Sequence, residues 1–277
     1  MSTHDHEHSP VATTLVSRPG AEEGGLHRDY SNGYKGAKFD SRVSREGAGD
    51  LGHMARTIED RGFYKRVGNP GLTGLMVHAV TLMSVSVQFM QFRGVTIPNA
   101  FVGNLWFCAG AYMFLVSIFT MVKGETFSST VFATFALDDS YAAILTPAFG
   151  VAAAFGDDTV GLNNALAMYL FIWNGAFMSI WLASLRTNIC LIVLFFGVTM
   201  GVWLLAGSYI VLANLAADGL TTSSSYRALA KSGGAFLFLS ACSGFYLVLV
   251  QIFESVDMPF ALPVGDVTPY WPKKKRA

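Results

Sequence analysis

Long apolar runs dominate the middle of this 277-residue sequence and constrain its fold more than any other feature. Only 11 charged residues lie between positions 69 and 253, whereas 20 lie in residues 1–68 and seven in residues 254–277. A soluble domain carries charge on about a quarter of its residues, spread along the chain. The distribution therefore predicts a membrane-embedded body between two polar ends, and it argues against a soluble enzyme, a secreted disulfide scaffold or a disordered chain.

Six segments are long enough to cross a bilayer as helices. A helix rises about 1.5 Å per residue, so about 20 apolar residues span a hydrocarbon core of roughly 30 Å. The segments are roughly residues 71–91, 101–122, 127–155, 161–185, 189–216 and 231–253. We therefore predict an all-α membrane protein with six transmembrane helices, whose even number places both termini on one side.

Basic residues indicate which side that is. Those on the side of the termini include Arg61, Lys65, Arg66, Lys123, Arg186 and the run at 273–276. The opposite loops are expected to hold Arg93, Arg227 and Lys231 alongside Asp157, Asp158 and Asp218. Because cytoplasmic loops carry an excess of Lys and Arg, both termini are predicted to be cytoplasmic.

The polar ends divide into three predicted parts around the transmembrane domain at 69–253. Residues 1–50 lack apolar periodicity and are expected to be a disordered cytoplasmic N-terminus. Residues 51–68 place apolar side chains at helical spacing, which indicates an amphipathic helix on the membrane surface; a solvated linker is the alternative. Residues 254–277 are expected to be a basic cytoplasmic tail that contacts anionic lipid, with a trafficking signal as the alternative.

Motifs for enzyme chemistry are absent from the sequence. Cys108, Cys190 and Cys242 lie inside apolar runs without paired spacing and are predicted to be buried small hydrophobes. The His-Asp-His-Glu-His run at 4–8 resembles a metal ligand set, but such runs in disordered termini are more often incidental. We therefore expect no enzyme activity, cofactor or metal site, and the balanced charge gives no reason to expect a nucleic-acid partner.

The entrance of the first span is a candidate pore mouth. Asn69 is a good helix N-cap, and Pro70 suits the first helical position. Such a helix start presents N–H groups and a positive dipole end to a carboxylate, although a simple capped start is the alternative. His78 follows inside the apolar span, where a histidine faces protein or water. It is either a group that responds to pH or anions, or a structural hydrogen-bonding residue.

Asp138 and Asp139 are the strongest anomaly in the apolar block. If they lay at an interface, the stretch 140–155 would be too short to span, so the run 127–155 requires both aspartates well inside. Each would then cost about 2.5–3.5 kcal/mol unless it is solvated or paired. We predict proton or cation handling, with structural hydrogen bonding or a break in the helix as alternatives. Pro147 is expected to kink this span.

Small and polar residues inside the spans favour close helix packing. The small-residue patterns are Ala109-Gly110, Gly197-x-x-x-Gly201 and Ser240-x-x-x-Gly244, and they allow helices to approach within or between protomers. Asn174 is expected to hydrogen-bond across helices, or else to line a path.

The chain resembles a known family over roughly residues 65–267. The resemblance rests on Asn69-Pro-Gly-Leu-Thr-Gly-Leu75, Lys123-Gly-Glu-Thr-Phe127, Leu185-Arg-Thr-Asn188, Lys231-Ser-Gly-Gly234 and Leu262-Pro-Val-Gly265, in that order. Together with six spans, these stretches are similar to the acetate uptake transporter family (GPR1/FUN34/YaaH), which includes bacterial acetate/succinate permeases and fungal acetate and ammonia-export proteins. The resemblance implies a homohexamer in which each six-helix protomer encloses its own pore for acetate or another short monocarboxylate.

The resemblance also implies which residues form the path. Its signature stretch gives a pore mouth at Asn69, Pro70, Gly74 and Leu75. The family's pore narrows at three side chains, usually Phe, Tyr and Leu. By the local matches these positions are His78, Phe135 and Val198 here, and all three depart from the usual choice. Leu72 likewise replaces the second Pro of the signature, so substrate preference is the property expected to differ.

Three functions are compatible with these features. The first is transport of small monocarboxylates, acetate foremost, across the plasma membrane by a proton-coupled carrier or an anion channel, with Asp138 or Asp139 handling protons. The second is export of ammonium or ammonia, because carboxylates inside the membrane would attract a cation. The third is a membrane sensor or scaffold. The expected partners are a small solute, the lipid bilayer and further copies of the chain.

Overall fold

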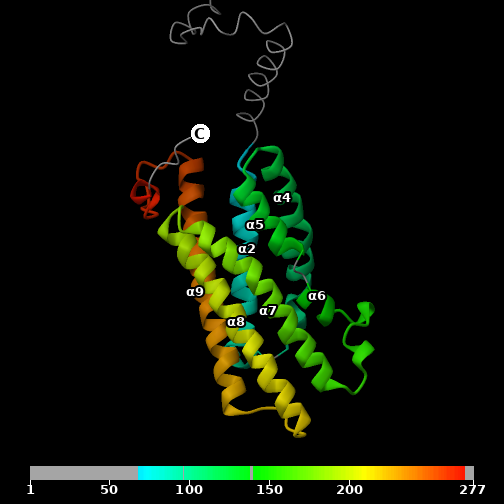
Figure 1. Cartoon of the computed structure of the whole chain (residues 1–277). Coiled ribbons are helices and arrows are strands. Elements are labelled where there is room, and N and C mark those ends of the chain that lie inside the picture. Colours follow the sequence, from blue (N-terminus) through cyan, green and yellow to red (C-terminus); the bar gives the residue numbers. More distant parts are fainter. Residues whose placement is uncertain (1–67, 96, 138–139, 272–277) are drawn as a thin grey trace, which may run out of the picture. The chain divides into compact units, whose positions relative to one another are not determined.

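The computed structural model describes residues 68–95, 97–137 and 140–271 as a helical body (Figure 1). Its membrane-length and medium helices are α2 (Pro70–Phe89), α4 (Met113–Val122), α5 (Thr126–Leu137), α7 (Thr159–Ser184), α8 (Ile189–Ala217) and α9 (Ser224–Ser255). The expectations for residues 1–67, Asp138, Asp139 and the basic run at 273–276 lie outside the described residues.

Among the residues that the structure describes, five segments are long and apolar enough to cross a membrane. They are Pro70–Phe89, Pro98–Val122, Thr159–Ser184, Ile189–Ala217 and Ser224–Ser255. The second of these is composite, because a π-helical segment at Leu105–Tyr112 joins the short α3 (Val102–Asn104) to α4. The structure thus confirms a helical membrane protein and five of the six predicted spans.

The third predicted span, 127–155, is not one continuous helix. After α5 the described pieces are α6 (Ser140–Leu145) and 3-10 turns at Pro147–Phe149 and Ala153–Phe155. Pro147 disfavours helical backbone at Thr146, which is extended with φ −98° and ψ 105°. Gly150 and Gly156 then take positive φ of 64° and 55°. The prediction of a span kinked at Pro147 is therefore wrong, because the helix ends before that residue.

Helix α9 begins earlier than the sequence predicts. Ser223 is its N-cap, and the Ser223 hydroxyl oxygen accepts a hydrogen bond of 3.1 Å from the Tyr226 N–H. Arg227 and Lys231, which are expected in a loop, therefore lie in the first turns of the helix. The cap moves the boundary because it satisfies an N–H group that has no partner within the helix.

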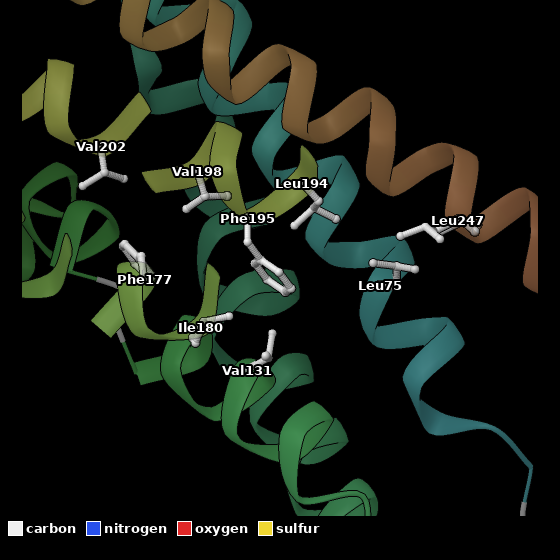
Figure 2. Close-up of a cluster of buried hydrophobic side chains, with 10 residues drawn as sticks. Leu75, Val131, Phe177, Ile180, Leu194, Phe195, Val198, Val202 and Leu247 are labelled. Carbon is white, nitrogen blue, oxygen red and sulfur yellow. The ribbon is translucent and has the colours of Figure 1, made fainter. Parts of the chain in front are cut away.

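Neighbouring helices pack in the order α7, α8, α9, α2, α4 and α5. Helix α8 therefore lies between α7 and α9, as Figure 1 shows. A buried apolar cluster joins α2, α5, α7, α8 and α9, and Figure 2 shows its members, including Leu75, Val131, Phe177, Val198 and Leu247. The interior of the body is thus lined by side chains from most of its helices.

Small residues bring α8 and α9 into close contact. A Cβ atom added to Gly197 would lie 2.7 Å from the Phe236 carbonyl oxygen, and one added to Gly233 would lie 3.0 Å from the Gly201 carbonyl oxygen. Gly244 meets helix α2 in a similar way. The structure therefore confirms close packing within one protomer for the Gly197-x-x-x-Gly201 and Ser240-x-x-x-Gly244 patterns.

The cysteines differ from the prediction in one case. Cys108 and Cys190 are partly buried, whereas Cys242 on α9 is exposed. The prediction of burial is therefore wrong for Cys242, because an apolar run in a membrane helix also supplies its outward face.

Candidate functional site

Two cavities inside the helical body share the His78 side chain. The inner cavity has a volume of about 170 Å³ and is lined by residues from α2, the π-helical segment and α4–α9, among them Ala109, Phe135, Tyr141, Val198 and Tyr209. The mouth cavity has a volume of about 210 Å³ and is lined by Asn69, Leu75, Glu125, Ser128 and Gln251, among others. His78 lines both cavities and is only 3% exposed. It therefore stands where the two cavities adjoin.

The three residues of the expected constriction lie together around the inner cavity. The rings of His78 and Phe135 meet edge-on, with centroids 4.3 Å apart. Phe135 stacks on Phe177 of α7 at 5.0 Å, and Val198 lines the same cavity from α8. Figure 2 shows Phe177 and Val198 on the two neighbouring helices. The structure therefore brings His78, Phe135 and Val198 to one place from α2, α5 and α8.

The Nε2 atom of His78 is buried and has no hydrogen-bond partner among the described residues. Buried polar atoms are nearly always paired, and leaving one unpaired costs about 1–3 kcal/mol. A structural role for His78 through a bond from Nε2 to a neighbouring helix is therefore not observed in the described part of the chain.

The Asn69 side chain caps α2 and ties it to α9. Its Oδ1 accepts from the Gly71 N–H at 3.0 Å, and its Nδ2 donates to Gln251 Oε1 at 3.1 Å. The simple capped start is therefore confirmed. Because Asn69 and Gln251 also line the mouth cavity, this bond joins two walls of the mouth.

The other expected mouth residues do not all line the mouth cavity. Pro70 is the first residue of α2, and Leu75 lines the mouth cavity. Gly74 instead faces a close contact, because an added Cβ would lie 2.7 Å from Val116 and 2.8 Å from Phe132. Gly74 therefore allows α2 to approach α4 and α5.

Asn174, the polar residue expected in the fourth span, is buried in α7. It is not among the residues that line either cavity. Its Oδ1 accepts no hydrogen bond from any described residue. This buried position does not support the path-lining alternative.

Comparison with known proteins supplies the family. Residues 57–268 match the GPR1/FUN34/yaaH family. The chain belongs to this family. It is 36% identical over 224 residues to Protein alcS of Aspergillus fumigatus, covering 76% of this chain and 80% of that protein.

Two further relatives and one solved structure add to this match. The chain is 32% identical over 225 residues to Acetate transporter protein patA of Penicillium expansum, covering 80% of this chain and 88% of that protein. It is 28% identical over 210 residues to Ammonia transport outward protein 2 of Saccharomyces cerevisiae, covering 73% of this chain and 69% of that protein. The bacterial acetate channel SatP shares the fold, with a TM-score of 0.58 and 21% identity over 72% of this chain and 100% of that chain.

Two stretches that carry the GPR1/FUN34/yaaH resemblance meet at one end of the body. Asn188 caps α8, and the neighbouring Ile189 N–H donates to the Gly265 carbonyl at 2.9 Å. Further on, the Trp271 Nε1–H donates to the Leu185 carbonyl at 2.9 Å. These motifs therefore hold the segment after α9 against the α7–α8 turn.

Sequence reasoning missed Glu125 as a residue that lines the mouth cavity. Its carboxylate pairs with Lys123 Nζ at 2.8 Å. The pair lies in the turn between α4 and α5, within one of the family stretches. Because the ammonium group offsets the carboxylate charge, the mouth is less repulsive to an anion than a lone glutamate would make it.

Sequence reasoning also missed a polar group on the wall of the inner cavity. The Tyr141 hydroxyl on α6 donates to Gln88 Oε1 on α2 at 3.1 Å, and Tyr209 of α8 lines the same cavity. A glutamine inside an apolar span is a signal that could have found this group, as it could have found Gln251. Side chains with hydroxyl groups thus add to His78 within an otherwise mostly apolar wall.

Proposed function

We propose that this chain moves small monocarboxylates, acetate foremost, across a membrane. The observation that carries the proposal is the position of His78, Phe135 and Val198 around one cavity that adjoins a polar mouth. A relative named as an acetate transporter and the shared fold of an acetate channel support it.

The two cavities would offer such a solute a polar environment first and an apolar environment second. The amide groups of Asn69 and Gln251 and the Ser128 hydroxyl offer hydrogen bonds at the mouth. Beyond His78 the wall becomes mostly apolar. A carboxylate would be solvated at the mouth and would lose that solvation inside, so we propose that a proton accompanies it.

Asp138 and Asp139 are our proposed proton-handling residues, although they lie outside the described residues. Purified Asp138→Asn and Asp139→Asn proteins in liposomes should lower acetate uptake and alter its dependence on pH. An unchanged rate and pH profile in both variants would remove this role.

The proposal also covers the location, the assembly and the polar ends of the protein. We place the protein in the plasma membrane as a homohexamer, with a disordered N-terminus at 1–50, an amphipathic helix at 51–68 and a basic tail on the cytoplasmic side. Exposed apolar side chains on α4, including Phe114, Leu115, Ile118 and Phe119, are available to lipid or to other copies. Crosslinking in native membranes tests the assembly, and protease access to each terminus tests the topology.

A second candidate function is export of ammonium or ammonia. The relative Ammonia transport outward protein 2 favours it. Ammonium and acetate fluxes from the same proteoliposomes separate the two functions. An acetate flux faster than the ammonium flux supports the primary proposal. Ammonium efflux without any acetate flux would support export of ammonium or ammonia instead.

A further inference from the structure

We propose that the inner cavity admits monocarboxylic acids with an apolar body about the size of a benzene ring, in their uncharged form. This inference rests on the proposed function and extends its substrate class beyond acetate. It follows from the size of the cavity, the chemistry of its wall and the buried imidazole at its edge.

The volume of the cavity exceeds what acetate requires. Its volume is about 170 Å³, whereas an engineered cavity of about 150 Å³ lined by Leu, Ile and Phe stays dry and binds benzene. Acetic acid has a single methyl group as its apolar part. A ring or a branched chain of similar size would fill space that acetic acid leaves empty, and it would gain the dispersion contacts that a void forfeits.

The wall of the cavity selects for an uncharged solute. Its apolar members include Ala109, Met113, Phe135, Val198 and Leu237, and no Asp, Glu, Lys or Arg is among the described residues that line it. An isolated carboxylate would lose its hydration there without an ion partner, at high cost. The protonated acid avoids that cost and keeps its apolar body against the wall.

His78 provides a binding partner for the carboxyl end. Its Nε2 is buried and has no partner among the described residues, and the ring lines the inner cavity. A carboxylic acid can both donate and accept a hydrogen bond, so it complements either tautomer of a neutral imidazole. With the carboxyl group at Nε2, the apolar body of the acid lies toward Phe135 and Val198.

Ala109 offers a way to change the size of the cavity. It lies in the π-helical segment and lines the cavity, whereas Ala111, two residues further on, is exposed and is not among the lining residues. An Ala109→Leu substitution would occupy part of the empty volume. Ala111→Leu is a matched control that adds the same atoms to the same segment.

The test measures exchange of labelled acetate at equal pH on both sides of proteoliposomes, with unlabelled acetate or benzoate as competitor and protein-free liposomes as background. In the wild-type protein, benzoate should compete at a lower concentration than acetate. Ala109→Leu should weaken competition by benzoate about tenfold more than competition by acetate, because an apolar pocket discriminates by about this factor per methylene. Ala111→Leu should leave both competitors unchanged.

The outcomes separate this inference from the proposed function. Acetate exchange that benzoate does not inhibit, or benzoate inhibition that Ala109→Leu does not weaken, overturns the inference and leaves acetate transport standing. Absence of acetate exchange above background overturns both. Val198→Leu, which adds one methylene to the same cavity from α8, is the second variant if Ala109→Leu does not fold, and Val122→Leu, at an exposed position on α4, is its control.

Discussion

The imidazole of His78 meets the ring of Phe135 edge-on, with centroids 4.3 Å apart and an interplanar angle of 62°. Edge-to-face contacts of this kind are favourable because the positive edge of one ring faces the negative face of the other. Phe135 is held in turn by its stack on Phe177. The expected constriction is therefore a packed aromatic unit that contains one imidazole, whose Nε2 has no hydrogen-bond partner among the described residues.

Replacement of His78 tests whether that atom sets substrate preference. We expect His78→Phe to shift preference toward acetate and away from larger acids, because the variant lacks the hydrogen-bonding group and fills more of the space. The ratio of acetate to butyrate exchange in proteoliposomes measures the shift. Val80→Phe, at a more exposed position of α2, should leave the ratio unchanged, and identical ratios in His78→Phe and wild type would place His78 outside the path.

The Asn69 side chain should contribute to stability as well as to the mouth. Asn69→Ala removes the cap on Gly71 N–H and the bond to Gln251, so we expect a loss of about 1 kcal/mol from the cap alone. Thermal unfolding of the purified protein in detergent measures the loss. Gln251→Ala keeps the cap and should cost less; an equal loss in both variants would assign the effect to the α2–α9 bond instead.

The contact between α8 and α9 should not tolerate an added methyl group at Gly197. An alanine Cβ there would lie 2.7 Å from the Phe236 carbonyl oxygen, and we expect Gly197→Ala to destabilise the protein by about 1–3 kcal/mol. Gly207, on the same helix, has no heavy atom within 4 Å of an added Cβ. Gly207→Ala should therefore be neutral or stabilise by up to about 1 kcal/mol. Equal melting temperatures for the two variants would contradict the close packing.

The segment after α9 should lose stability in acid. The Thr268 hydroxyl and backbone N–H donate to Asp266 Oδ1, and these bonds lower the pKa of that carboxyl below its ordinary value. A lowered pKa gives a stabilising contribution that is full above the ordinary carboxyl pKa and is lost as pH falls through the folded-state pKa. Asp266→Asn mimics the protonated group, so its melting temperature should fall below wild type at neutral pH and converge with it in acid. A constant difference would show that the charge is not involved.

The apolar runs and the capping residues made much of this fold predictable. Runs near or above 20 residues correctly predict five spans, because only helices satisfy backbone polar groups inside a membrane. Asn69 followed by Pro70 correctly predicts the start of α2. The family resemblance also selected three positions that lie around one cavity, although they are on α2, α5 and α8.

Features that depend on contacts between distant residues were not predictable in the same way. The π-helical segment at Leu105–Tyr112 has the same apolar composition as an α-helix, so the sequence carries no signal for it. The bond between Tyr141 and Gln88 joins residues 53 positions apart. The break after Leu145 was missed because hydropathy remains high through Pro147, although a proline and two glycines mark the site.

Exchange of labelled acetate in proteoliposomes that contain the purified full-length chain tests the central claim most directly, when wild type is compared with Ala109→Trp and Ala111→Trp. If acetate passes through the inner cavity, wild type and Ala111→Trp should exchange acetate well above protein-free liposomes, and Ala109→Trp should fall to that background while remaining folded by its melting curve. Wild-type exchange at the background level, or full exchange by a folded Ala109→Trp, would contradict the account.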